Sequence, residues 1–518
     1  MNPSTRVVLN TFVTYVRFVA GLMFGLFSSR WILAALGQTD YGIYGVVGSV
    51  IAVATFLNTV LATSVSRFYS VTIGEAGEDA LPKEDNAELR GWFNAALALH
   101  AGIAVIVLAV GWPLGEWALQ HWLTIPADRL GASLWVLRAG LVAAALSVAS
   151  VPYSGMFTAW QRFGELAAFE LLRSGATFAV AASILSASGD RLVVFAFLLA
   201  GLSCAISLLQ IVRARFRFGA CRIECGTLPQ IARMRELVSY AGWRVLGIFG
   251  WLVQKQGGAF AVNVSFGTKA NAAFAIANQV VTHASSLMNA LAAALVPALA
   301  TEMGKGGGAA VKPFALKSCK FTGILAAVCA VPLLCEMDYI LRLWLHFPPN
   351  GSGALASAFI VAMVVDSSTT GIVAALSATR NIGPWQTFEC LVLVGTCPAA
   401  LICFRQGRSI AAIGVVFIVA SAMIVVGRVW FARRMMELRA GEWLVRALLP
   451  IVAVVLLSAM SAWAIRASLS PSLLRFGLVV FGSLLVTFLA AFMIAMNGQE
   501  RNAAWQIITR GWRVHGCR

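Results

Sequence analysis

Charged residues are scarce in this sequence: Asp, Glu, Lys and Arg together make up only 12% of its 518 residues. Soluble domains carry about 25% charged residues, so half of the usual charge is missing, and a soluble enzyme or a disordered scaffold is excluded. The chain is instead 59% hydrophobic, with a mean hydropathy of +0.82. One helical crossing takes about 20 apolar residues. The composition therefore predicts an all-α polytopic membrane protein.

Motifs of catalytic and metal sites are also missing. The ten cysteines include no CxxC pair, and the five histidines do not have the spacing of zinc ligands. The glycine-rich segment 304–308 lacks the Lys-Ser/Thr pair of an ATP-binding loop and is interpreted as a connector. We therefore expect no enzymatic activity, no catalytic residues, no metal site and no cofactor.

Acidic residues are the scarcer of the two charge types: 22 Asp and Glu stand against 39 Lys and Arg, a net charge of +17. In a soluble protein this surplus would suggest nucleic acid. In a membrane protein the cytoplasmic loops collect Lys and Arg, so we expect no nucleic-acid partner.

Fourteen apolar stretches have the length of a membrane span. They are residues 9–34, 42–64, 92–113, 134–157, 165–187, 192–212, 238–262, 271–298, 319–341, 354–378, 385–404, 410–431, 443–465 and 474–496. If the N-terminus is cytoplasmic, the basic residues gather on the cytoplasmic side, in 213–237, 305–320, a cluster that includes Arg428, Arg433 and Arg434, and the tail 501–518. The charge distribution predicts that both termini are cytoplasmic.

An internal repeat is indicated by two similar turns. Residues 36–42 (LGQTDYG) join the first two stretches, and residues 266–272 (FGTKANA) join the seventh and eighth, with their glycines 230 positions apart (267 − 37). Parallel repeats of this kind are a transporter architecture, with the substrate path between the halves. We predict a six-helix lobe over 1–212, a basic cytoplasmic linker over 213–237, a second six-helix lobe over 238–435, and a terminal helix pair with a basic tail over 436–518.

Several cationic and amide side chains fall inside apolar stretches, where charge costs about 2.5–3.5 kcal/mol and usually faces a cavity or a partner. They are Arg17, Arg138, Arg173, Arg244, Lys255, Asn58, Asn278 and Asn289. Arg244 and Lys255 are 11 positions apart, about three helical turns, and so share one face. One interpretation is a cationic cavity for an anionic headgroup such as a pyrophosphate. The alternative is that Arg17, Arg138 and Arg173 lie near helix ends and reach the membrane surface, or that Glu170 pairs with Arg173.

Acidic residues in the spans are candidates for ion coupling. Asp366 lies in the middle of the tenth stretch, directly before Ser367, Ser368, Thr369 and Thr370. It binds a coupling H+ or Na+ or is simply hydrogen-bonded, and the sequence leaves both interpretations open. Glu170 is the second candidate.

At this point the residues resemble a known family. The segment Ser29-Arg30-Trp31-Ile32-Leu33, followed by Leu36-Gly37-Gln38-Thr39-Asp40-Tyr41-Gly42, is similar to the signature of polysaccharide-repeat (O-antigen) flippases of the multidrug/oligosaccharidyl-lipid/polysaccharide exporter superfamily. Further similar landmarks follow in order: Ser66-Arg67-Phe68, Val151-Pro152-Tyr153, Tyr240-Ala241-Gly242-Trp243 and Leu343-Trp344-Leu345. The resemblance spans roughly residues 5–435.

The resemblance implies a multidrug-exporter-like (MATE-like) fold of twelve to fourteen helices in two lobes around a central cavity. It also implies a flippase that moves an undecaprenyl-pyrophosphate-linked oligosaccharide across the bacterial inner membrane, with membrane lipids and other polysaccharide-assembly proteins as partners. Arg30 and Arg67 match positions of the family signature and are added as cavity or gate residues.

Two other classes stay open. A multidrug or small-solute antiporter of the same fold would favour an acidic cavity for cationic drugs, whereas the candidates here are basic. A membrane-embedded glycan polymerase or ligase would need a long external loop with catalytic residues, and the external segments are short.

Overall fold

The computed structural model describes the backbone of residues 3–75, 81–82, 84, 86–223, 231–377, 383–498 and 500–501. It describes their side chains except those of residues 3–22, 54, 57–60, 63, 74, 163, 239–244 and 287–310.

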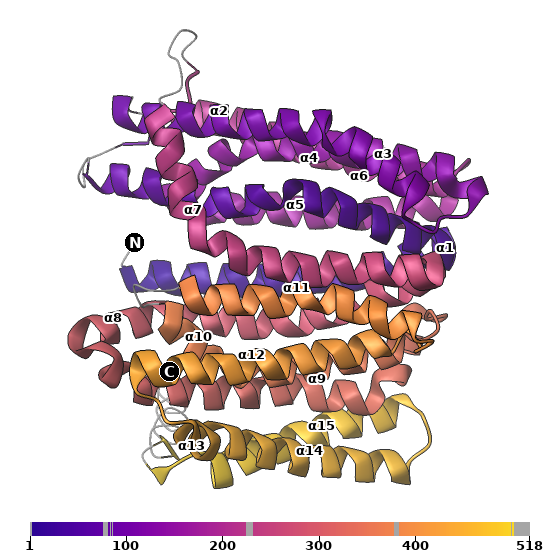
Figure 1. The fold of residues 1–518 in the computed structure, drawn as a ribbon, viewed down its shortest axis with the longest axis vertical. Helices are drawn as coiled ribbons and strands as arrows, with labels where there is room; N and C mark the ends of the chain where they lie inside the picture. Colours follow the sequence, from indigo (N-terminus) through magenta and orange to yellow (C-terminus); the bar gives the residue numbers. More distant parts are fainter. Residues whose placement is uncertain are drawn as a thin grey trace, which may run out of the picture. The chain divides into compact units, whose positions relative to one another are not determined.

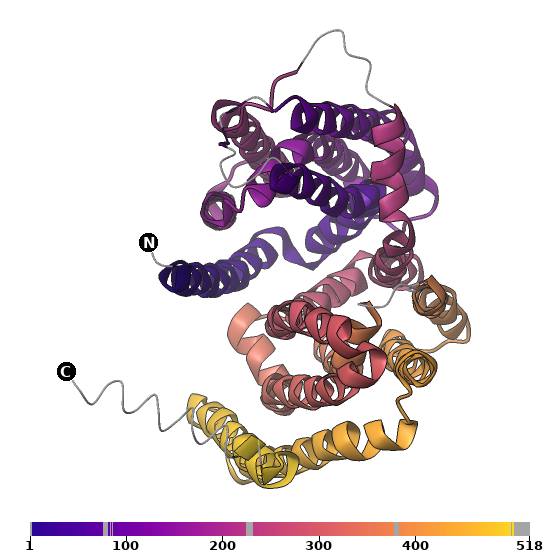
Figure 2. The same cartoon turned by 90° about the vertical axis from the view of Figure 1, so that its left-hand side faces the viewer.

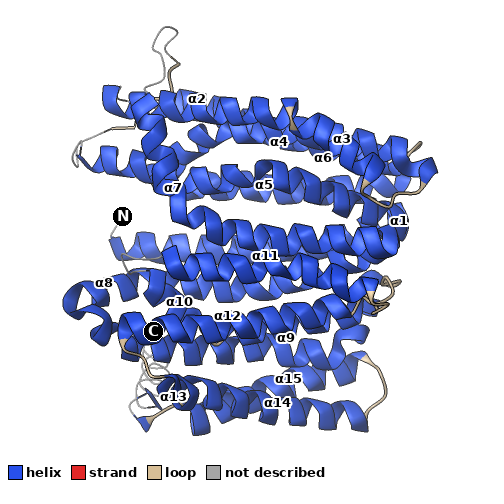
Figure 3. Ribbon diagram, in the orientation of Figure 1, coloured by secondary structure: helices blue, strands red, loops and turns tan. Residues whose placement is uncertain are grey.

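Within this described part, every regular element is a helix and no strand occurs (Figure 3). Each of the fourteen predicted stretches lies mainly on helical backbone. Nine of the described helices are long and apolar enough to cross a membrane, or ten if a bent pair is one span. The predicted fold class, an all-α polytopic membrane protein, is confirmed.

Two long helices each contain a sharp break that separates two predicted spans. The first, α1 (Pro3–Glu75), breaks at Gly37, which has φ 70° and ψ 174°. The other, α8 (Gly258–Leu345), breaks at Gly267, where φ is 78°. Only glycine adopts a positive φ at little cost. Each of the two turns predicted from sequence therefore has a glycine at the position where the backbone needs one.

The chain divides into two compact units. Unit 1 comprises Met1–Ala275, Trp344–Asn350 and Leu393–Ile410, and unit 2 comprises Ile276–Leu343, Gly351–Val392 and Ala411–Arg518. The lobe, linker and terminal-pair boundaries given above stay predictions.

Most of the long helices of unit 1 lie roughly along one axis in Figure 1 and are seen closer to end-on in Figure 2, whereas the helix Ile231–Leu252 runs across them. Besides α1, its elements are α2 (Ala87–Ala109), α3 (Gly111–His121), η1 (Ala127–Arg129), α4 (Leu130–Ala159), α5 (Phe163–Ser183), η2 (Ile184–Ser186), α6 (Arg191–Arg217), α7 (Ile231–Leu252), the π-helical turn η3 (Val253–Gly257), the start of α8 and the second half of α11 (Gly383–Arg405). Fully buried side chains such as Ile43, Leu137 and Phe195 form its core.

Unit 2 contains the rest of α8 and the helices that follow it. They are α9 (Ser352–Ser367), α10 (Thr370–Ser377), the first half of α11 (Gly383–Arg405), α12 (Ala412–Met436), α13 (Ala440–Trp443), the π turn η4 (Leu444–Leu448), α14 (Leu449–Ser468), α15 (Leu473–Ala490) and the π turn η5 (Ala491–Ala495). The contacts between α14 and α15 confirm the predicted terminal helices as a packed pair (Figure 1).

The outward faces of these helices are apolar. Ile106 in α2 is 60% exposed and Trp463 in α14 is 68% exposed. A soluble protein does not expose such residues over whole helices, whereas a bilayer covers them. The chain is therefore a multi-pass membrane protein, and the cytoplasmic location of both termini stays a prediction.

Candidate functional site

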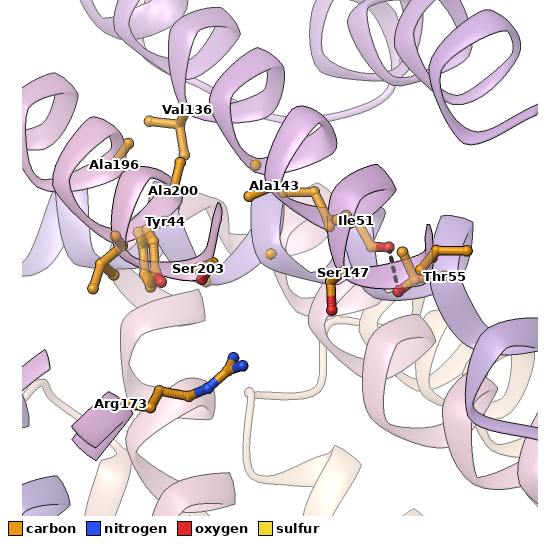
Figure 4. A pocket seen from close by; sticks show the side chains of 16 residues that line it. Tyr44, Ile51, Thr55, Val136, Ala143, Ser147, Arg173, Ala196, Ala200 and Ser203 are labelled. Atoms are coloured by element: carbon orange, nitrogen blue, oxygen red, sulfur yellow. Dashed lines mark hydrogen bonds between the residues drawn. The ribbon is translucent and has the colours of Figure 1, made fainter. Parts of the chain in front are cut away.

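A polar cavity of about 500 Å³ lies within unit 1, between α1, α4, α5 and α6. Small residues create the space: Gly48 of α1 faces it with no atom within 4 Å of where a Cβ would be, and Ala143 and Ala200 line it from α4 and α6. Its polar groups are the hydroxyls of Tyr44, Thr55, Ser147 and Ser203 and the guanidinium of Arg173 (Figure 4). The volume is in the range of small-molecule sites, about 300–1,000 Å³.

Arg173 is the cation of this cavity. It is nine residues from the start of the candidate span Gly164–Ser186, or about 13 Å along the helix axis at 1.5 Å per residue. Its side chain extends from α5 toward the part of the pocket where Ser147 and Ser203 lie (Figure 4). Its Nε is buried and has no hydrogen-bond partner among the described residues. Arg173 therefore lies in the interior of its span, not at the helix end that the alternative interpretation required.

The second alternative for Arg173, pairing with Glu170, is not seen either. Glu170 is exposed, and among the described side chains no ion pair joins the two residues. Arg173 thus has a buried donor without a partner among the described residues, on a side chain that lines a polar cavity. An unsatisfied group of this kind calls for an explanation, and an external acceptor in the cavity is one.

Arg138, by contrast, is engaged in a local contact. Its Nε donates to Oε1 of Glu116 at 2.7 Å, and its guanidinium lies 5.1 Å from the ring centre of Trp135. Trp112 donates to the same Glu116 oxygen at 2.8 Å. This ion pair between α3 and α4 explains why Arg138 is tolerated in an apolar helix, and no substrate is needed for that explanation.

The structure places the remaining predicted cations elsewhere. Arg30 is half-buried, and its Nη2 lies 2.7 Å from Nε2 of His346. Arg67 is exposed near the end of α1. Lys255 is exposed on the π turn η3. The prediction that Lys255 and Arg244 share one helix face assumed a regular α-helix between them, and the π turn interrupts that regular helix.

Among the predicted amides, Asn278 is the one with a described side chain, and it does not line the cavity in unit 1. Asn278 is half-buried on α8. Four other predicted residues lie outside the described side chains: Arg17, Asn58, Arg244 and Asn289.

Unit 2 contains a buried charge cluster centred on Arg428. Its Nη1 donates to Oδ1 of Asp366 at 2.6 Å and to the hydroxyl of Thr369 at 3.0 Å, and its Nη2 donates to Glu389. Arg428 is 5% exposed and Glu389 is 5% exposed. Two carboxylates share one guanidinium here, so α9, α11 and α12 are joined through charged groups.

This cluster corrects one sequence interpretation. Arg428 was grouped with Arg433 and Arg434 as part of a cytoplasmic basic cluster, but the structure places it inside α12, in the core. Its neighbours Arg433 and Arg434 are exposed near the helix end. The three arginines lie within six positions of one another, so their places in the sequence did not show that Arg428 is buried while Arg433 and Arg434 are exposed.

Asp366 lies where the helix breaks. The axis bends by 54° between α9 and α10. The carbonyl oxygens freed near the break accept side-chain hydrogen bonds, at Ser367 from Thr322 (3.0 Å) and at Ser368 from Trp443 (3.1 Å). Backbone at membrane depth needs such partners because lipid offers none. Asp366 is therefore hydrogen-bonded, as one of its two interpretations held, and its role in ion coupling stays a prediction.

The hydroxyl residues of the cavity were not predicted from sequence. Ser147 and Ser203 are single hydroxyls in apolar helices, and such residues commonly bond to their own backbone. A weak signal exists in the glycines and alanines around them, which leave room on one helix face.

No model of a known protein family matches the sequence, and no curated protein matches it. Solved structures do match. The lipid II flippase MurJ in an inward closed conformation aligns with 93% of this chain and 98% of its own, at 10% identity and a TM-score of 0.68.

Two other matches are transporters. An inward-facing multidrug resistance MATE family transporter of the MOP superfamily aligns with 81% of this chain and 95% of its own, at 14% identity and a TM-score of 0.64. A MOP superfamily transporter from Pyrococcus furiosus aligns with 83% of this chain and 93% of its own, at 12% identity and a TM-score of 0.51. At such identities the likeness concerns the backbone: this chain has the helical membrane fold found in MurJ and in MATE transporters.

Proposed function

We propose that this protein is a flippase for a pyrophosphate-linked oligosaccharide carried on a polyprenyl lipid, in a bacterial inner membrane. The observation that carries the proposal is Arg173, a cation in the interior of a span with a buried, unpartnered Nε, directed into a cavity lined by hydroxyls. An ionised donor gives stronger hydrogen bonds to phosphate oxygens than a neutral one.

The rest of the cavity fits the other part of such a substrate. Sugars present many hydroxyls, and the side chains of Tyr44, Thr55, Ser147 and Ser203 offer matching donors and acceptors. A pyrophosphate with its sugars cannot cross about 30 Å of hydrocarbon unaided. The protein needs only to present this cavity to one side of the membrane and then to the other, while the polyprenyl tail stays in lipid.

The fold supports a transporter of this kind, because solved structures with the same fold include a lipid II flippase. They also include multidrug transporters, so a drug exporter is the competing function. The residues that line the cavity include Arg173 and no carboxylate among those described. A cationic drug would find repulsion there and no counter-charge.

Two elements of the proposal concern coupling and partners. A gradient of H+ or Na+ drives the return step with Asp366 as the coupling residue, and the coupling ion competes there with Arg428 for the carboxylate. The substrate comes from enzymes that assemble the oligosaccharide on its carrier, and these assembly proteins are the expected partners. No catalytic residue is assigned to this chain.

The test uses a strain in which the protein is depleted and replaced by variants. Lipid-linked saccharides are assigned to a leaflet with a membrane-impermeant lectin on oriented vesicles. We expect Arg173→Gln to leave finished saccharides on the cytoplasmic leaflet and Arg173→Lys, which keeps the charge, to restore part of the transfer. A normal distribution with altered drug tolerance would contradict the flippase and favour the exporter, and altered polymer length would favour a polymerase.

A further inference from the structure

A second polar pocket, of about 530 Å³, lies in unit 2 and is not part of the cavity around Arg173. It is lined by residues 313–320 of α8, by η4 and the start of α14, and by the residues that follow α15. Val445 and Arg446 lie near the start of the candidate span Ala440–Ser468, and Ile494 and Ala495 lie at the end of Leu473–Ala495. These two span ends place the pocket at a membrane boundary, at the depth of lipid headgroups.

The lining of this pocket is rich in positive charge. It contains Lys317, Lys320 and Arg446 against a single carboxylate, Glu500. Lys320 is 6% exposed, and its Nζ donates to Glu500 at 2.6 Å and to the carbonyl of Ala495 at 2.8 Å. Lys320 and Glu500 therefore neutralise each other, and the charges of the other two cations are left in excess.

Glu500 is held in its ionised form by this contact. Burial raises the pKa of its carboxyl, but the hydrogen bonds from Lys320 and from the backbone N–H of Asn497, with the charges of Lys320 and Lys317, outweigh burial and lower the pKa below its usual value. The nearer oxygen of Glu500 is 4.0 Å from Nζ of Lys317, whose side chain is 52% exposed. Lys317 keeps donors available, since an ammonium group has three.

Apolar side chains line the pocket next to these charged groups. Val445 is 60% exposed and Ile494 is 51% exposed, and both line the pocket together with Pro313 and Pro450. Cations at the membrane boundary next to exposed apolar side chains are complementary to an amphiphile with a negatively charged head.

We propose that this pocket binds an anionic glycerophospholipid of the surrounding leaflet, with its phosphate held by Lys317 and Arg446 and its chains against Val445 and Ile494. Basic pockets between membrane helices bind phospholipid headgroups in this way. The buried Lys320–Glu500 pair fixes the floor of the pocket. If the predicted orientation holds, the site faces the cytoplasmic leaflet.

The test measures lipid binding to the purified full-length protein by native mass spectrometry, so it does not depend on the transport proposal. The probes are phosphatidylglycerol, the net-neutral phosphatidylethanolamine, inorganic pyrophosphate and a polyprenyl phosphate. The test variant is Lys317→Ala with Arg446→Ala. The matched control is Arg433→Ala with Arg434→Ala, which removes the same charge from exposed positions of the same unit.

We expect phosphatidylglycerol to bind more tightly than phosphatidylethanolamine. The double variant should weaken phosphatidylglycerol binding about 30-fold, from about a fivefold loss for each of the two cations. The control should bind as the parent does. Arg446→Glu alone, at an exposed position, repeats the test should the double variant fold poorly.

Three outcomes would overturn the proposal. Equal losses in the test and control variants would mean general surface attraction. Pyrophosphate binding as tight as lipid binding would mean a site for soluble anions. Binding of the polyprenyl phosphate in preference to phosphatidylglycerol would assign the pocket to the carrier lipid.

Discussion

Gly42 of α1 packs directly against Thr268 of α8: a Cβ at position 42 would overlap the carbonyl oxygen of Thr268. Asn271 secures the contact, since its Nδ2 donates to the carbonyl of Gly42 at 3.1 Å. The two segments each follow a glycine with positive φ, 70° at Gly37 and 78° at Gly267. The two turns recognised as a repeat in the sequence therefore each contain a glycine with positive φ, and the segments that follow them contact each other inside unit 1.

This packing predicts an order of stability among three glycine variants. Gly42→Ala should lower the free energy of unfolding by about 3 kcal/mol, because the added methyl group meets backbone that cannot move aside. Gly37→Ala and Gly267→Ala should each cost about 1–2 kcal/mol, since their Cβ atoms would have no neighbour within 4 Å and only the positive φ is penalised. Thermal unfolding in detergent, followed by tryptophan fluorescence, measures all three. A milder effect at position 42 than at the other two would contradict the contact.

The cavity around Arg173 predicts a loss of transport when it is filled. Gly48→Leu places a side chain into the open space of the pocket, so we expect transfer of lipid-linked saccharide to fall more than tenfold. Folding should be preserved, because leucine has a higher helix propensity than glycine. Gly201→Leu is the matched control: Gly201 is exposed on α6, has free space and does not line the pocket. Equal losses in the two variants would argue against this pocket as the substrate site.

The cluster in unit 2 predicts a strong effect at Arg428. Arg428→Met should destabilise the protein by about 3 kcal/mol or more, because it leaves the buried Glu389 and the half-buried Asp366 as neighbouring charges without a cation. Adding Glu389→Gln to that variant should recover part of the loss, since one of the two unpaired charges is then removed. Thermal midpoints of the single and double variants measure this, with the exposed Arg434→Ala as control. No recovery in the double variant would mean that packing, not charge, holds the cluster.

The contacts of Arg129 predict a dependence on pH. Its Nη1 donates to Asp190 at 2.8 Å, and its Nη2 donates to Asp40 at 2.5 Å. These hydrogen bonds lower the pKa of Asp190 below its usual 3.8, whereas burial raises the pKa of Asp40 in spite of them. A lowered carboxyl pKa adds stability above the usual value, and this stability is lost as the pH falls through the lowered one.

Arg129→Gln should therefore cost about 1 kcal/mol at pH 7, a small figure because water screens these partly exposed groups. The difference from the parent should shrink below pH 4, where the carboxyls become protonated in both proteins. Thermal midpoints measured across this pH range provide the check. A difference that does not change with pH would mean that Arg129 acts through packing alone.

The spans and the two turns could be predicted because they depend on local properties: runs of apolar residues, and glycines where the backbone must turn. The candidate site depended on partners that are distant in sequence. Arg138 and Arg173 look alike as single arginines in apolar helices, yet one has Glu116 as a partner, 22 positions away, and the other lines a cavity. Only the packing of α3, α4 and α5 distinguishes them.

Arg428 is a second residue whose environment could not be predicted from the sequence. It is close in sequence to exposed arginines, and its partners Asp366 and Glu389 precede it by 62 and 39 positions. Apolar residues occur on every face of α12, so the sequence has no amphipathic pattern that would show which face of the helix is buried.

The hydrogen bonds of Arg428 to α9 and α11 also restrict how unit 2 deforms. Sliding any of the three helices by one turn, about 5.4 Å, would separate these charges, two of which, Arg428 and Glu389, are buried. Near the bend, Thr322 and Trp443 add further cross-links to the carbonyls of Ser367 and Ser368. These segments of α8, α9, α11, α12 and α13 therefore behave as one mechanical block. During any conformational cycle of the protein, we expect the backbone to bend at positions outside these segments.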